Sequence, residues 1–220
     1  MANSNDINGI CLEVFAKISA AISHEIKNTL AIINESAGLL DDMVHLVGGG
    51  DNPIGANRVQ AAAETIMKQV NRSNVIMKNL NRFAHSGDSS PGTAPIAEVV
   101  ELITALSARQ AAMKKITVVA DCPVNTVIEA DLLSLEALLY LTVRQMYEVA
   151  AGGSGLTIRT EESPPHLVIV FLSDSPEAIP PASYPGAKET VLAEHLQGSC
   201  HQNRNTFSIS IPVKGERHTQ

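Results

Sequence analysis

Apolar side chains recur at alternating steps of three and four along the first part of the chain. This spacing places them on one face of a helix, and it predicts a long α-helix from Ile10 to Val47 with a heptad-like seam. The stretch 48–53 holds three glycines and Pro53, which interrupt helical geometry, so the helix is expected to end there. The seam consists of Phe15, Ile18, Ile22, Ile26, Leu30, Ile33, Ala37, Leu40, Val44 and Val47.

A second helix with the same period is predicted between the glycines and the polar segment 86–92. The two helices form a long antiparallel hairpin, and we expect residues 1–90 to be one domain. A single hairpin buries too little of both seams, so two chains are expected to pair as a four-helix bundle, which makes the protein a homodimer. The second seam consists of Val59, Ala62, Ile66, Val70, Met77, Leu80 and Ala84, with Ser73 or Asn74 as a polar interruption.

Strand-like and helical patterns alternate after residue 90. This order predicts an α/β sandwich over residues 91–220, with helices on one face of a sheet, and an α+β fold class for the whole chain. The predicted helices are 96–113, 132–150 and 188–196, and the predicted strands are 116–120, 126–128, 156–159, 166–172 and 206–211.

Composition and charge exclude several classes of protein. The formal net charge of −7, with three Tyr, four Phe and no Trp, offers nucleic acid neither a basic surface nor stacking platforms. No apolar run approaches the roughly 18 residues of a membrane span, and the amino terminus lacks a signal-peptide pattern, so we expect a cytoplasmic protein with no membrane partner. Cys11, Cys122 and Cys200 are far apart and form no CxxC pair, so neither a disulfide framework nor a zinc site is expected. No cofactor is expected either.

His24 is the main candidate for chemistry. It stands two positions after the seam residue Ile22, about 200° further around the helix, so its imidazole is expected to point to solvent. A neutral imidazole is a nucleophile at physiological pH and can accept a phosphoryl group. An ordinary solvated histidine is the alternative. The His-Glu-x-x-His pattern of zinc proteases is excluded, because position 28 is asparagine.

The neighbours of His24 form a recognisable string. Residues 23–30 read Ser-His-Glu-Ile-Lys-Asn-Thr-Leu, which closely resembles the phosphoacceptor box of sensor histidine kinases, carried there on the long first helix. The resemblance implies that His24 is the phosphoacceptor and that Glu25 holds its other ring nitrogen and assists proton removal. It also implies that Asn28 supports dephosphorylation of a partner.

Two further positions of the box can be interpreted from helix geometry. Lys27 lies three residues after His24 on the same helix face, where it can reach a phosphoryl group or only keep the helix soluble. Thr29 stands where the family has proline. Because proline bends a helix and contributes no functional side chain, this change is expected to remove a kink and no reacting group.

The second half resembles the GHKL-type ATP-binding domain of histidine kinases over residues 95–213, but its active motifs are eroded. Tyr140 and Arg144 stand at the approximate places of the Mg²⁺-binding asparagines, and a guanidinium cannot ligate Mg²⁺. Asp174 keeps the place of the adenine-reading aspartate without the glycines that follow it in the family. Gly186 alone remains of the second glycine motif, whereas a phosphate cradle needs several converging N–H groups.

These features together predict a histidine phosphotransferase of a bacterial-type phosphorelay. His24 would take a phosphoryl group from the aspartate of one response-regulator receiver domain and pass it to another without ATP. The expected partners are receiver domains and an upstream hybrid kinase. Two alternatives stay open: a divergent but active histidine kinase that uses Asp174, and a non-catalytic scaffold or inhibitor that binds a kinase or receiver.

Overall fold

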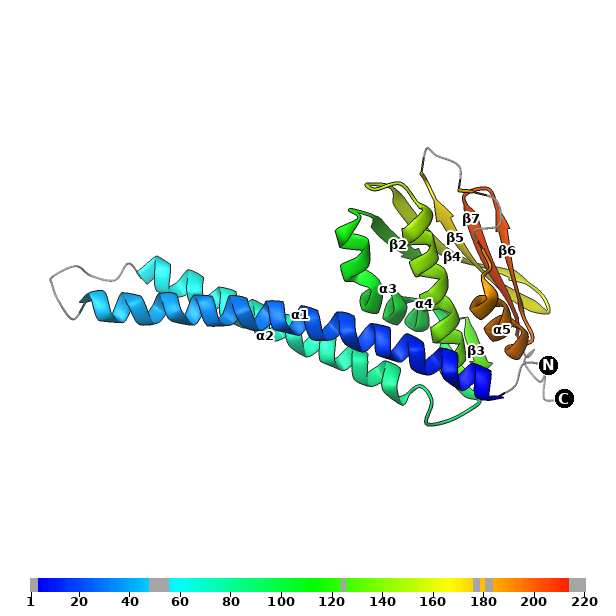
Figure 1. Cartoon of the computed structure of the whole chain (residues 1–220), viewed down its shortest axis with the longest axis horizontal. Coiled ribbons are helices and arrows are strands. Elements are labelled where there is room, and N and C mark those ends of the chain that lie inside the picture. Colours follow the sequence, from blue (N-terminus) through cyan, green and yellow to red (C-terminus); the bar gives the residue numbers. More distant parts are fainter. Residues whose placement is uncertain (1–3, 48–55, 124–125, 176–178, 181–183, 214–220) are drawn as a thin grey trace. The chain divides into compact units, whose positions relative to one another are not determined.

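The computed structural model describes residues 4–47, 56–123, 126–175, 179–180 and 184–213, and the predicted helix break at 48–53 lies outside them. The chain divides into two compact units, residues 19–81 and residues 1–18 with 82–220. The first unit is a helical hairpin and the second contains an α/β sandwich, so the predicted order of a hairpin followed by a sandwich is confirmed (Figure 1). The domain boundary at residue 90 stays a prediction.

Two long helices form the hairpin, α1 (Ser4–Val47) and α2 (Ala56–His85). Helix α1 begins six residues before the predicted start at Ile10. An apolar line does extend into this first stretch, because Ile7, Cys11 and Val14 are buried at steps of four and three. The acidic side chain of Asp6 in the first turn also suits the positive end of the helix dipole. The predicted start was therefore too late, because Ile7 and the residues one and two turns after it form a buried line that the predicted seam did not include.

The contact line inside the hairpin runs one residue away from the predicted seam at several places. On α1, Thr29 and Met43 are buried, whereas their neighbours Leu30 and Val44 are exposed. On α2, Gln69 is buried and the next residue, Val70, is exposed. One position along a helix is about 100° around it, so the predicted seam combines residues from two adjacent faces. One face contacts the other helix of the hairpin, and the second face stays uncovered within the chain.

The sandwich is built on a five-stranded sheet in the order β2-β4-β5-β7-β6. Strand β2 pairs with β4 in parallel, and the other neighbours in this sheet are antiparallel. A separate antiparallel pair is formed by β1 and β3. The strands are β1 (Gly92–Pro95), β2 (Thr117–Asp121), β3 (Val127–Ala130), β4 (Gly155–Ser163), β5 (His166–Ser173), β6 (Ser199–Asn203) and β7 (Thr206–Pro212), and the helices are α3 (Ile96–Met113), α4 (Leu132–Val149) and α5 (Ala187–His195).

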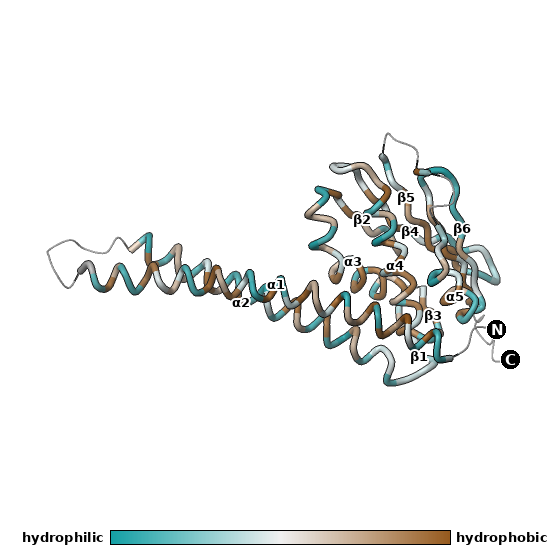
Figure 2. The backbone as a smooth tube through the Cα atoms, in the orientation of Figure 1, coloured by the Kyte–Doolittle hydropathy of each residue, from teal (hydrophilic) through white to brown (hydrophobic). Residues whose placement is uncertain are grey.

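Helices α3, α4 and α5 cover one face of this sheet (Figure 1). Strand β7 alternates as a half-buried strand should, because Phe207, Ile209 and Ile211 are buried and the serines between them are partly exposed. Helix α4 lies at the centre of the unit and buries most of its side chains. Figure 2 shows the hydrophobic positions of α3 and α4 concentrated in this helical layer. The core of the unit therefore lies between the sheet and α4.

The first turns of α1 and the last turn of α2 belong to the sandwich unit. The rings of Phe15 and Phe83 stack with their centroids 6.2 Å apart. Glu13 accepts hydrogen bonds from the ammonium groups of Lys17, at 2.7 Å, and of Lys188, at 2.5 Å. Hydrogen bonds from Lys17 and Lys188 lower the pKa of the Glu13 carboxyl to about 2. An aromatic pair and a charged cluster thus bind the base of α1 to its own unit.

The helices of the sandwich match the predicted ones closely, and α3 has the predicted bounds. Two strands were not predicted. Strand β1 contains Gly92 and Pro95, which are poor strand formers, and it exists because it pairs with β3. Strand β6 has the polar sequence Ser-Cys-His-Gln-Asn and lies at the sheet edge, where pairing with β7 alone defines it. Strand β1 thus depends on a partner that is distant in sequence, and β6 is itself too polar to be recognised as a strand.

Candidate functional site

His24 lies on α1 with its side chain exposed, as its place two residues after the buried Ile22 predicts. Its ring has no hydrogen-bond partner among the described residues. Lys27 and Asn28 follow on the same helix and are exposed as well. The imidazole is therefore accessible from solvent, with a cation and an amide available on the same face.

Glu25 has a defined partner on the other helix. Its Oε1 accepts a hydrogen bond from Nη2 of Arg72 at 2.7 Å, and its side chain is only 19% exposed. The sequence pattern predicts that Glu25 serves the imidazole of His24, but in this structure the carboxylate is engaged by α2. Arg72 lies 47 residues away and outside the box, so no local pattern pointed to it.

A buried polar layer crosses the hairpin one turn beyond Glu25. The hydroxyl of Thr29, 1% exposed, lies 2.8 Å from the carbonyl oxygen of Ile26 and 2.7 Å from the hydroxyl of Ser73. The Ser73 hydroxyl also lies 3.0 Å from the carbonyl of Gln69, whose own side-chain Oε1 is buried with no partner among the described residues. Thr29 thus does more than replace a proline, because it binds α2.

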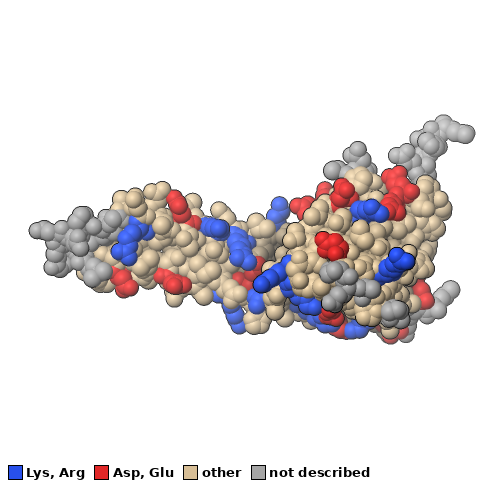
Figure 3. Space-filling model, turned by 90° about the horizontal axis from the view of Figure 1, so that it is seen from above, with Lys and Arg blue, Asp and Glu red and all other residues tan. Residues whose placement is uncertain are grey.

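The two contacts, Glu25 with Arg72 and Thr29 with Ser73, join consecutive residues of α2 to positions one helical turn apart on α1. A hydrophobic seam alone tolerates sliding, whereas specific hydrogen bonds form in one register. The two contacts therefore fix the register of α1 against α2 beside His24. The face of the hairpin seen in Figure 3 carries Lys and Arg interspersed with Asp and Glu and has no field of one sign.

We expect Thr29→Val to destabilise the protein by about 1 kcal/mol, because valine keeps the volume but removes the hydrogen bond with Ser73, whose half-buried hydroxyl then keeps the carbonyl of Gln69. Urea unfolding measures the change. Ser73→Ala in the same chain should recover part of the loss, since two apolar groups leave nothing unpaired. Thr65→Val is the matched control, because the Thr65 hydroxyl donates to the carbonyl of Ala61 on its own helix and to no other group among the described residues. Equal losses at both threonines would contradict a role for the layer.

Tyr140 and Arg144, the two residues expected at the approximate places of magnesium ligands, both have partners within the sandwich unit. Tyr140 is fully buried, and its hydroxyl accepts a hydrogen bond from Nε2 of Gln110 at 3.0 Å. Burial raises the pKa of this phenol, so it stays protonated. Arg144 donates to Glu148 one turn along α4, at 3.1 Å. Both side chains have structural partners.

Asp174 follows β5, and its carboxylate is also engaged. Its Oδ1 accepts a hydrogen bond from the backbone N–H of Gly155 at 2.5 Å, and its own N–H donates to the carbonyl of Gly155. The segment 176–178, where the family has glycines, lies outside the described residues. Gly186 is the residue before α5, with extended backbone geometry.

Tyr184 is a central residue that the sequence did not single out. It is buried, its ring stacks on Phe207 with centroids 4.3 Å apart, and its hydroxyl lies 3.1 Å from the hydroxyl of Thr142 on α4. Burial raises the pKa of this phenol well above its ordinary value. The one signal for it in the sequence was an aromatic residue within the proline-rich segment 180–185. Its ring occupies space between α4 and β7.

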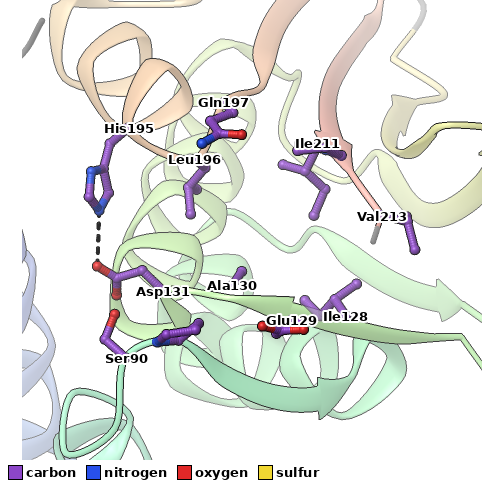
Figure 4. A pocket seen from close by; sticks show the side chains of 12 residues that line it. Ser90, Ile128, Glu129, Ala130, Asp131, His195, Leu196, Gln197, Ile211 and Val213 are labelled. Atoms are coloured by element: carbon purple, nitrogen blue, oxygen red, sulfur yellow. Dashed lines mark hydrogen bonds and ion pairs between the residues drawn. The ribbon is translucent and has the colours of Figure 1, made fainter. Parts of the chain in front are cut away.

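A pocket of about 280 Å³ opens at the lower end of the sandwich, where Asp131 and His195 pair at 3.0 Å (Figure 4). Asp131 also accepts the N–H of Ser134 as the N-cap of α4. Burial acts to raise the pKa of the Asp131 carboxyl, but the hydrogen bonds from His195 and Ser134 outweigh it, and the pKa is lowered. The Asp131–His195 pair therefore has a structural role, since it joins the start of α4 to the end of α5.

Among the described residues, no group of three or more His, Cys, Asp or Glu side chains is arranged to hold a metal ion. None of the helices in the described part of the chain combines the length and apolarity of a membrane span.

No protein-family model and no curated protein matches the sequence. Solved structures of histidine kinases are similar to the chain. The Acinetobacter baumannii histidine kinase AdeS is 14% identical, with 87% of this chain and 98% of that chain covered and a TM-score of 0.49. The histidine kinase ThkA, in complex with the response regulator TrrA, is 15% identical, with 94% and 64% covered and a TM-score of 0.47. A histidine kinase from Burkholderia phymatum is 13% identical, with 91% and 98% covered and a TM-score of 0.47. These identities and TM-scores are low, so the function of this protein has to be inferred from its own residues.

Proposed function

We propose that the protein is a histidine phosphotransferase that relays a phosphoryl group between aspartates of response-regulator receiver domains through His24, without ATP. The observation that carries the proposal is the exposure of His24 within the Ser-His-Glu-Ile-Lys-Asn-Thr-Leu string on α1. A nucleophile that must meet an aspartyl phosphate on another protein has to be reachable from solvent, and a receiver can approach α1 from that side.

The transfer can be written with ordinary side-chain chemistry. A ring nitrogen of His24 attacks phosphorus, the bond from phosphorus to the receiver's carboxyl oxygen breaks, and its electron pair returns to the aspartate. The proton on the second ring nitrogen leaves to Glu25 or to water. Lys27 can contact phosphoryl oxygens from the same helix face. Asn28 can orient a water for the slower hydrolysis of the acyl phosphate.

Three features of the sandwich support a relay that uses no ATP. Tyr140 stands at the approximate place of a magnesium ligand, but it is buried and its hydroxyl is hydrogen-bonded to Gln110. A magnesium ligand would have to reach phosphates that enter from solvent. One oxygen of Asp174 is engaged by the backbone of Gly155. The ring of Tyr184 fills the space between Phe207 and Thr142 of α4. The sandwich then serves to hold the base of the hairpin and to contact partners, and the phosphoryl donor is a receiver or an upstream hybrid kinase.

A homodimer is part of the proposal, because the hairpin leaves an apolar stripe uncovered. Leu30, Ala37 and Val44 of α1 are exposed, as are Val70 and Met77 of α2. Each lies one position beyond a residue of the internal contact line. In an antiparallel pair, the same rotation in each helix turns these side chains to the same side of the hairpin. A second copy that presents the same stripe would complete a four-helix bundle and bury both.

Met77→Glu should weaken the dimer about a hundredfold, because it would bury an unpaired carboxylate at the interface. Light scattering after gel filtration, over a range of protein concentrations, measures the oligomeric state. Val75→Glu is the matched control. Val75 is likewise exposed on α2, but lies two positions away and thus faces about 160° from Met77. A wild-type monomer, or equal behaviour of the two variants, would exclude this interface.

A transfer assay tests the function. Receiver domains of the same organism, labelled from acetyl phosphate, are mixed with the purified full chain in the absence of nucleotide. We expect label on this protein within minutes and then on a second receiver. Label that appears only with ATP and Mg²⁺ would favour the divergent kinase. A protein that binds receivers and takes label from neither source would favour the scaffold or inhibitor.

A further inference from the structure

The carboxylate of Glu25, next to His24 on α1, is bound by Arg72 of the opposite helix, α2. Consecutive residues of a helix point about 100° apart, so Glu25 does not face His24 directly. Its carboxylate turns toward α2, where Nη2 of Arg72 donates to Oε1 at 2.7 Å. Glu25 is largely covered, whereas Arg72 is 55% exposed. The direction of the Glu25 side chain is therefore set by a residue outside the histidine string.

Glu25 is the residue next to His24 on α1, so the charge of this pair lies near any phosphoryl group that reaches the imidazole. A bare Glu25 carboxylate would repel the negatively charged donor, and the guanidinium of Arg72 balances that charge. Arg72 thus holds the acid in place and lowers the electrostatic cost of approach.

We infer that Arg72 is a positioning residue of the His24 site, which acts by fixing and neutralising the Glu25 carboxylate. The inference rests on the proposed phosphotransfer at His24 and adds a residue of α2 to that site. Ser73, the next residue of α2, bonds Thr29, so the helix that carries Arg72 is held in register beside the site. Because Arg72 acts through Glu25, its effect disappears when Glu25 is made neutral.

Phosphoramidate is a suitable probe, since it phosphorylates histidine without any partner protein. A ring nitrogen of His24 attacks its phosphorus, the P–N bond breaks and ammonia leaves. The full chain is treated with phosphoramidate, and mass spectrometry follows occupancy at His24. The exposed His45 of the same helix is the internal reference. We expect Arg72→Ala to slow His24 about tenfold relative to His45, and Arg72→Lys to stay within about threefold of wild type.

The same substitutions in a Glu25→Gln chain separate positioning from general damage. There, Arg72→Ala should change the rate less than about twofold, because the group it positions is gone. Arg82→Ala breaks another Arg–Glu pair of 2.7 Å, with Glu98, and should leave His24 unaffected. An exposed ion pair adds at most about 1 kcal/mol, so each variant should stay folded, which thermal unfolding checks.

The outcomes distinguish this inference from the proposed function. An Arg72→Ala chain that reacts as fast as wild type, or that loses as much rate without Glu25, overturns the role of Arg72 and leaves the relay intact. A wild-type chain whose His24 reacts no faster than His45 and takes no label from any receiver overturns both.

Discussion

Replacement of His24 by glutamine is expected to abolish phosphoryl transfer, with a fall of at least about a thousandfold in the rate of labelling. Glutamine keeps a polar side chain of similar length but has no nucleophilic nitrogen, since its amide lone pair is delocalised. The side chain is exposed, so the free energy of unfolding should change by no more than about 0.5 kcal/mol. Label transfer from a phosphorylated receiver and a urea unfolding curve, measured on the same preparation, provide both values.

His45→Gln is the matched control, because His45 is a second exposed histidine of α1, and its Nε2 lies 3.6 Å from the carboxylate of Asp41. It should transfer at the wild-type rate. The label on the wild type should be acid-labile and alkali-stable, as expected of a phosphoramidate. A His24→Gln protein that still carries label from receiver to receiver would reject His24 as the phosphoacceptor.

Glu136→Gln is expected to stabilise the protein by about 3 kcal/mol at pH 8. Glu136 lies on α4, is 3% exposed, and its Oε2 has no partner among the described residues. Burial, only partly offset by a hydrogen bond with Ser86 and by the charge of Arg82, raises the pKa of this carboxyl from 4.5 to about 7. Glutamine mimics the neutral acid and has no proton to lose.

The pH window follows from the sign of this shift. Below pH 4.5 the carboxyl is protonated in both states. As the pH rises toward 7, the unfolded chain releases the proton while the folded chain retains it, so the wild type loses stability relative to Glu136→Gln. Above pH 7 the difference is constant. Unfolding curves between pH 4 and 8 measure it.

Glu148→Gln is the control for this substitution, because Glu148 is an exposed carboxylate of the same helix and should change stability by less than about 0.5 kcal/mol. A Glu136→Gln protein with the wild-type pH dependence, or one that is less stable at pH 8, would show that the buried carboxyl is already ionised and paired in the folded state.

The sequence alone determined the elements that depend on local periodicity. The three-and-four spacing predicted both hairpin helices, and the change of period after residue 90 predicted the sandwich with α3 at its observed bounds. The exposure of His24 followed from its angle to Ile22. These properties depend on residues within a turn or two of one another, and such distances are preserved when a chain folds.

Only the tertiary structure decided which distant groups meet. Period alone could not separate two adjacent apolar faces, so it did not reveal that Thr29 contacts α2 while Leu30 is uncovered. Arg72 lies 47 residues from Glu25, and Tyr184 lies 42 residues from its partner Thr142. Hydrogen bonds and ion pairs act over a few ångströms in space, and sequence separation carries no information about such distances until the helices and strands have packed.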